Sequence, residues 1–173
     1  NNLPHKNVET LIRAWGRLAA PAPRLVLCGA GFVGAQGIRR ALAAVGGEER
    51  SQVIERAGLD DLVALYNGAE LLASTSRYEG FCLPVVEAFA CGIPVLAADA
   101  GAIPEIAGDA ALLVPPERVD LITSEMYRLL VEQELRRGLV ERGFRRAERF
   151  SWEEAARRTL AVYAEAVRAG SLS

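Results

Sequence analysis

Short apolar runs alternate with longer amphipathic segments along this chain, and this alternation constrains its fold most strongly. The apolar runs are typical of strands buried on both faces, whereas the longer segments repeat apolar residues at helical spacing. We expect strands at residues 24–28, 53–56, 70–75, 94–98 and 111–114. We expect helices at residues 8–19, 38–45, 60–68, 84–91, 119–131, 134–149 and 152–168. This order predicts one α/β domain over residues 1–173, built on an open parallel sheet with helices on both faces.

Three glycine-containing loops follow predicted strands, at the edge of an open α/β sheet where ligands bind. They are residues 29–34 (GAGFVG), 79–83 (EGFCL) and 99–105 (DAGAIPE). GAGFVG matches the G-x-G-x-x-G pattern of dinucleotide-binding loops, but no acidic residue ends a second strand roughly 20 residues later. We therefore expect Gly29 and Gly31 to form a tight turn that admits another ligand backbone-first, with a purely structural turn as the alternative.

Two carboxylates, Glu79 and Glu87, interrupt the apolar and small residues of the stretch SRYEGFCLPVVEAFACGIPVL. An ionised carboxylate in apolar surroundings needs a partner. Pro84 suits the first turn of the helix expected at residues 84–91, and no good N-cap residue precedes it, so the first-turn amides favour an anion. Either Glu87 offsets the helix dipole and Glu79 is solvated, or both accept hydrogen bonds from ligand hydroxyls such as those of a sugar nucleotide.

The cations of the chain are nearly all arginine, because Lys6 is the only lysine and His5 the only histidine. Chemistry that needs either residue type must use these two positions or another chain or domain. The net charge of −2 gives no sign of nucleic-acid binding. Towards the C-terminus, arginines alternate with glutamates, which is typical of a solvated, salt-bridged helix surface, with membrane or nucleic-acid contact as the alternative. These arginines are Arg136, Arg137, Arg142, Arg145, Arg146, Arg149, Arg157 and Arg158.

Three cysteines, Cys28, Cys82 and Cys91, lie in or beside apolar runs without the spacing of metal ligands. Their odd number favours buried, reduced thiols and a reducing compartment over a disulfide or metal role. No apolar run reaches the roughly 20 residues that span a bilayer, and no signal-peptide pattern is present.

The segment EGFCLPVVEAFACGIPV closely resembles the E-x7-E signature of the group 1, family 4 retaining glycosyltransferases of the GT-B fold, whose usual form is EGFGLPxxEAxAxGxPV. Other segments resemble the same family: PHKNVETLIRAW, RLVLCGAG, LVALYNGAELLASTSRYEGF, DAGAIPEIAGDAALLVPP and RFSWEEAARRTLAVY. Together they cover nearly the whole chain. The resemblance implies a Rossmann-like nucleotide-sugar-binding domain, the C-terminal half of a GT-B enzyme whose N-terminal acceptor domain is absent from this sequence.

The resemblance also implies roles for individual residues. Glu79 would contact the donor hexose and act in catalysis together with Lys6, and Glu87 would bind the ribose hydroxyls. Lys6 would neutralise the diphosphate, so neither a metal ion nor a cofactor is expected. The loop amides that would hold the hexose and diphosphate belong to Gly80, Phe81, Cys82 and Leu83.

The chain departs from the family pattern at two positions. Cys82 stands where glycine is common, and Asn1 stands where many members carry an arginine that serves as a second phosphate cation. The second difference leaves Lys6 and the helix amides with more of the diphosphate charge to balance. The family also places a strand directly before Asn1, so the chain is expected to be a fragment.

The expected function is therefore donor binding in the retaining transfer of a hexosyl unit from a GDP- or UDP-hexose to a glycan or lipid-linked acceptor. The PHKN segment favours GDP-mannose by family analogy. We expect the full-length enzyme to be cytoplasmic or peripheral at the inner membrane, and the isolated domain to be inactive. One alternative is a non-catalytic nucleotide-binding module. The other is a GT-B-fold sugar-nucleotide epimerase, for which the sequence offers no evident acid/base side chains.

Overall fold

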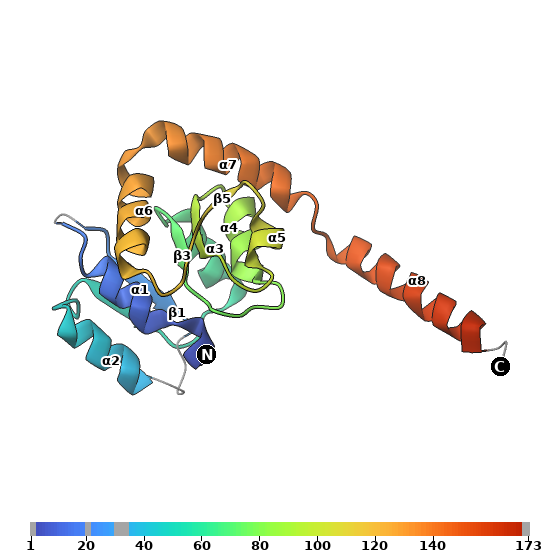
Figure 1. Cartoon of the computed structure of the whole chain (residues 1–173), viewed down its shortest axis with the longest axis horizontal. Coiled ribbons are helices and arrows are strands. Elements are labelled where there is room, and N and C mark those ends of the chain that lie inside the picture. Colours follow the sequence, from blue (N-terminus) through green and yellow to red (C-terminus); the bar gives the residue numbers. More distant parts are fainter. Residues whose placement is uncertain (1–2, 20–21, 30–34, 171–173) are drawn as a thin grey trace.

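The computed structural model describes residues 3–19, 22–29 and 35–170, which form an α/β body with a long C-terminal helix that projects from it (Figure 1). The strands are β1 (Leu25–Cys28), β2 (Ser51–Ile54), β3 (Leu72–Ser74), β4 (Val95–Ala98) and β5 (Ala111–Val114). The helices are η1 (Pro4–Lys6), α1 (Val8–Trp15), α2 (Ala35–Ala44), α3 (Leu59–Asn67), α4 (Leu83–Ala90), α5 (Ile103–Ala107), α6 (Val119–Val131), α7 (Gln133–Ala147) and α8 (Trp152–Gly170).

Every strand pairing is parallel, as predicted, but the pairings build two sheets where the sequence suggested one. Strand β1 pairs with β2, and β4 lies between β3 and β5. Side chains rather than hydrogen bonds join the two sheets, because one apolar cluster contains Leu27 of β1, Leu96 of β4 and Ile12 and Ile122 of the helices α1 and α6. The α/β prediction is thus confirmed, with the body held together by helix packing.

Helices cover the two sheets unequally. All four residues of β4 are buried, which fits the prediction of a strand covered on both faces. In contrast, Val26 of β1 and Val53 of β2 are 39% and 42% exposed, and α3 contributes no buried side chain. The predicted covering by helices is thus most complete over β4 and less complete over β1 and β2.

The short helices are the main elements that the sequence pattern missed. Helix α5 has five residues with Pro104 in its first turn, and the segment DAGAIPE was interpreted as a loop because it is too short to show a helical period. The helix predicted at residues 8–19 ends at Trp15, where Gly16 forms the C-cap. Strand β2 begins at Ser51, two residues before the predicted start.

The arginine-rich C-terminal region has two kinds of contact. Arg137, Arg157 and Arg158 pair with glutamates one turn away on their own helices, which confirms the predicted salt-bridged surface there. Arg142 and Arg146 differ, because they donate to the main-chain carbonyls of Asp109 (2.7 Å) and Ile106 (2.8 Å) and so attach α7 to the end of α5. These two arginines are structural anchors.

Helix α8 leaves most of its side chains exposed (Figure 1). Its exposed apolar residues include Trp152, Leu160, Tyr163 and Val167. Among the described residues, no helix is both long and apolar enough to cross a membrane.

Candidate functional site

The two residues that were predicted to be catalytic meet in the structure. Lys6 ends the 3-10 helix η1, and its Nζ lies 2.5 Å from Oε1 of Glu79, which follows β3. Their side chains are 35% and 15% exposed, so both remain within reach of solvent. The fold therefore brings the only lysine of the chain to the first carboxylate of the signature, across 73 positions of sequence.

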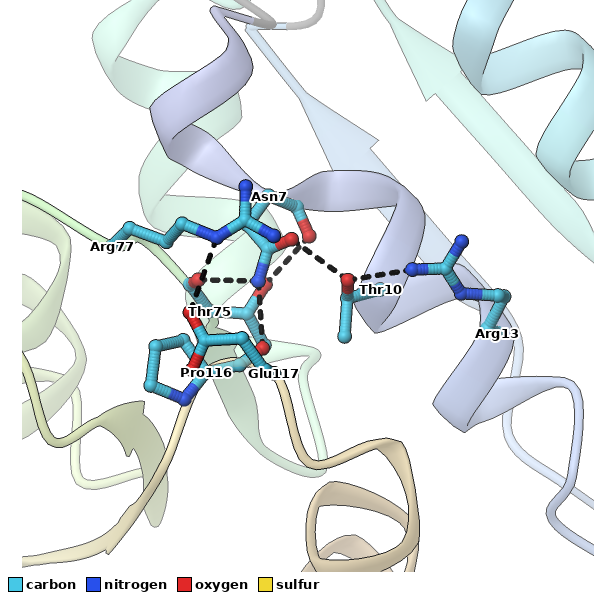
Figure 2. A network of polar contacts seen from close by, with 7 residues as sticks. All are labelled: Asn7, Thr10, Arg13, Thr75, Arg77, Pro116 and Glu117. Carbon is cyan, nitrogen blue, oxygen red and sulfur yellow. Dashed lines mark hydrogen bonds and ion pairs between the residues drawn. The ribbon is translucent and has the colours of Figure 1, made fainter.

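A buried network around Asn7 holds these two segments together (Figure 2). The Asn7 side-chain amide donates to the carbonyls of Thr75 (3.1 Å) and Pro116 (2.7 Å), and its oxygen accepts from Thr10 (2.7 Å). The Thr75 hydroxyl donates back to the Asn7 carbonyl at 3.1 Å. Asn7 also has a left-handed backbone (φ 55°), which asparagine tolerates better than most residues. Asn7 directly follows Lys6, so these bonds hold the end of η1 against the strand end that leads to Glu79.

The backbone of Glu79 is supported from a second direction by the loop after β4. The Ala102 amide donates to the Glu79 carbonyl at 3.1 Å. A Cβ on Gly101 would lie 3.0 Å from both the nitrogen and the oxygen of Glu79, and Gly101 has a positive φ of 57°. Only glycine lets the two loops approach this closely without strain.

The loop between Glu79 and α4 presents unused main-chain donors. Within the described ranges, the amides of Gly80, Phe81 and Cys82 donate no hydrogen bond to the protein, and α4 has no side-chain N-cap. Open space surrounds the position of a Cβ on Gly80. The Phe81 ring packs edge-on against Phe150, with 5.3 Å between centroids. Leu83 begins α4 and is 47% exposed. This arrangement suits an anionic or hydroxyl-bearing ligand.

Cys82, the residue that departs from the family pattern, has the left-handed backbone that glycine would accept easily. Its φ is 73° and its side chain is buried against the core cluster around α4. Burial raises the pKa of the Cys82 thiol, so the protonated form is favoured. The thiol thus fills a core position while its backbone forms the N-cap of α4.

We expect Cys82→Gly to change the free energy of unfolding by less than about 1 kcal/mol, because relief of the left-handed backbone offsets the lost packing. Cys82→Val should destabilise by at least about 2 kcal/mol, since a β-branched side chain disfavours this conformation. Urea unfolding measures both. Cys91→Val is the control, because Cys91 has an ordinary right-handed backbone. Equal stability of the glycine and valine variants at position 82 would contradict this account.

The contact with Lys6 determines the protonation state of Glu79. Partial burial alone would raise the pKa of the Glu79 carboxyl, but hydrogen bonds from Lys6 and Ser76 and the positive charge of Lys6 outweigh burial and lower it. Glu79 is therefore ionised at neutral pH and forms a genuine ion pair with Lys6.

This shift predicts how stability depends on pH. A carboxyl with a lowered pKa in the folded state stabilises the protein above its ordinary value of 4.5, and the contribution is lost as the pH falls through the lowered pKa. Glu79→Gln should thus be less stable than the wild type above pH 4.5, and the gap should narrow in more acidic solution. Chemical unfolding between pH 3 and pH 7 measures this gap, with Glu165→Gln on α8 as a control for net charge. A gap that widens on acidification would rule out the ion pair.

Glu87, the second carboxylate of the signature, lies on the exposed side of α4. Its Oε2 accepts a 2.7 Å hydrogen bond from the Tyr66 hydroxyl of α3. Sequence reasoning did not find this partner. Gly29 follows β1 and its amide donates to the Ile54 carbonyl at 2.9 Å, and Gly31 lies outside the described residues.

The cysteines and acidic groups show no metal site in the part of the chain that the structure describes. All three thiols are free, as predicted. The expectation that all three are buried is wrong, because Cys28 is exposed on β1 and Cys91 is only half-buried. Cys28 is exposed for the same reason as Val26, since β1 lacks a complete helical cover.

A surface hollow of about 320 Å³ lies next to the Asn7 network. Its lining includes Leu3, Glu9, Arg13 and Arg77, and it takes in neither Lys6 nor the two signature carboxylates. Arg13 donates a hydrogen bond to the Thr10 hydroxyl, one turn earlier on α1, as Figure 2 shows. The hollow therefore adjoins the candidate site without forming it.

Residues 2–146 match the family described as Glycosyl transferases group 1. The chain belongs to this family. The match includes Lys6, Glu79 and Glu87, together with the whole loop that joins the two carboxylates.

A curated relative and two solved structures agree with this assignment. An MMP alpha-(1->4)-mannosyltransferase from Mycolicibacterium hassiacum is 46% identical over 112 residues, which is 62% of this chain and 27% of that protein. Sucrose-phosphate synthase from Thermosynechococcus elongatus is 26% identical with a TM-score of 0.86, covering 96% of this chain and 44% of that one. Anabaena Alr3699/HepE in complex with UDP-glucose is 22% identical with a TM-score of 0.84, covering 94% and 46%.

The chain spans less than half the length of these three proteins. The two solved structures confirm the predicted Rossmann-like α/β fold of the C-terminal half of a GT-B glycosyltransferase. For this group 1 chain, the roles of the two carboxylates and the lysine stay predictions, and the structure adds Asn7, Thr75, Gly101 and Tyr66 around them. Sequence reasoning gave these four residues no role, although Gly101 lies in one of the three glycine loops and the others lie in segments that resemble the family.

Proposed function

We propose that this chain is the donor-binding domain of a retaining glycosyltransferase that transfers a hexosyl unit from a nucleotide diphosphate sugar. The observation that carries the proposal is the ion pair of Lys6 and Glu79 beside a loop with unused amides. A cation, a carboxylate and free main-chain donors are the groups that bind a diphosphate and a sugar. Glu87 lies on α4, the helix that follows this loop, where its carboxylate can accept hydrogen bonds from the ribose hydroxyls.

The site suggests how the residues act on a bound donor. The diphosphate carries more negative charge than one carboxylate, so it competes with Glu79 for the Lys6 ammonium. Glu79, once released, can accept hydrogen bonds from the hexose hydroxyls. Charge builds on the diphosphate as its bond to the anomeric carbon breaks, and Lys6 and the amides of residues 80–83 stabilise that charge.

We favour GDP-mannose as the donor. The support is the PHKN segment and the name of the M. hassiacum relative, a mannosyltransferase. The Anabaena structure holds UDP-glucose, which makes UDP-glucose the natural competing donor in any test. We further propose that a glycan or lipid-linked acceptor binds to a part of the enzyme outside this chain, in the cytoplasm or at the inner face of a membrane.

The test is a titration of GDP, UDP, GDP-mannose and UDP-glucose into the protein, followed by a transfer assay with the complete enzyme and NMR analysis of the product anomer. The proposal expects binding of a nucleotide sugar and a product that keeps the anomeric configuration of the donor. Epimerised donor without transfer would favour the epimerase alternative. Binding without any reaction of the complete protein would favour a non-catalytic module, and absence of binding would overturn the proposal.

A further inference from the structure

The contact between Tyr66 and Glu87 has no part in the roles assigned so far. Tyr66 lies in the last turn of α3 and donates its hydroxyl hydrogen to Glu87 Oε2 at 2.7 Å. Its ring is partly buried against the core cluster that contains Val85 and Phe89 of α4. Helix α3 exposes Leu59 and Val63, whereas Tyr66 contacts α4 through the hydrogen bond to Glu87.

The hydrogen bond leaves half of the carboxylate available. A carboxylate has two oxygens, each able to accept more than one hydrogen bond. Among the described residues, Oε1 of Glu87 has no hydrogen-bond donor, and no cation lies within salt-bridge distance. Glu87 is therefore oriented from one side by Tyr66 and open to solvent on the other.

The Tyr66 hydroxyl acts as a donor throughout the physiological pH range. Burial raises the pKa of Tyr66, and the hydrogen bond to Glu87 and its negative charge raise it further. A tyrosine that stays protonated is neutral, so it donates a hydrogen bond to the carboxylate and does not repel it as a phenolate would.

We propose that Tyr66 is a positioning residue that fixes the Glu87 carboxylate for the ribose diol of the nucleotide. This inference rests on the proposed function, because it takes the ribose as the partner of Glu87. A free glutamate on a helix surface samples several rotamers, and accepting hydrogen bonds from the diol requires one that turns the open Oε1 towards the ribose. The tyrosine selects that rotamer before the ligand arrives, which lowers the ordering cost of binding.

The test compares ribonucleotides with analogues that lack the diol. Tyr66→Phe keeps the ring packing and removes only the hydroxyl. By calorimetry, its affinity for GDP or UDP, whichever the wild type binds, should fall about fivefold, whereas its affinity for the 2′,3′-dideoxy form should not change. In a Glu87→Gln background, Tyr66→Phe should cause no further loss. Tyr127→Phe, which removes an exposed hydroxyl of α6, is the matched control.

The outcomes separate this inference from the function on which it rests. If Tyr66→Phe binds the ribonucleotide as tightly as the wild type, Tyr66 does not position Glu87. If it weakens ribo and dideoxy forms equally, or still acts when Glu87 is Gln, its role is structural and the inference is overturned. Either result leaves nucleotide binding by the wild type intact. A wild-type protein that binds no nucleotide would overturn the proposed function and this inference together.

Discussion

Lys6→Gln should lower the affinity for UDP and GDP by about 10- to 100-fold, while the affinity for uridine and guanosine stays unchanged. The reason is that Lys6 is the side-chain cation placed at the candidate diphosphate site, 2.5 Å from Glu79. Calorimetric titration of each nucleotide and nucleoside measures the difference. Lys6→Arg keeps the charge and should retain most of the affinity, and Arg17→Gln controls for the loss of an exposed cation just after helix α1. Equal losses for nucleotide and nucleoside would show that Lys6 acts on the fold and not on phosphate.

A second readout uses the fact that Lys6 is the only lysine of the chain. Apart from the α-amine, acylation reports on this one side chain. Bound UDP or GDP should slow the reaction, and the nucleosides should not. Because Glu79 already holds the ammonium in the free protein, Glu79→Gln should speed acylation when no ligand is present. A faster reaction in the presence of diphosphate would contradict the phosphate role.

The regular elements and the loops of the site could be predicted because their signals are local. Strand β5 and helix α6 have the predicted bounds, since buried strands and amphipathic helices both leave a period in the sequence. The loop of residues 79–83 was identified in the same way, from a glycine after a predicted strand and Pro84 at the start of a helix.

The contacts that assemble the site could not be predicted, because they join segments that are distant in sequence. Nothing in the pattern around Glu87 indicates Tyr66, 21 residues earlier on another helix. The link between Asn7 and Pro116 spans 109 positions and depends on two loops meeting. The division into two sheets has the same origin, since hydrogen bonding between strands leaves no trace in the pattern of one strand.

The Asn7 network should be the largest single source of stability around the site. Asn7→Ala would leave the carbonyls of Thr75 and Pro116 without their buried donor and would place alanine in a left-handed backbone. Each unsatisfied buried group costs about 1 to 3 kcal/mol, so we expect the free energy of unfolding to fall by about 3 kcal/mol. Urea unfolding measures this loss.

Asn67→Ala is the matched control for the Asn7 prediction, because Asn67 is exposed at the end of α3 and should change stability by less than about 0.5 kcal/mol. Asn7→Asp should be at least as damaging as alanine, since it exchanges a donor for a charged oxygen that faces two carbonyls. Variants that still fold should also bind UDP or GDP more weakly, because the side-chain bonds of Asn7 hold the backbone directly after Lys6 in place. Should Asn7→Ala prove as stable as Asn67→Ala, the buried amide would not be what joins η1 and β3, and the position of Lys6 against Glu79 would need another cause.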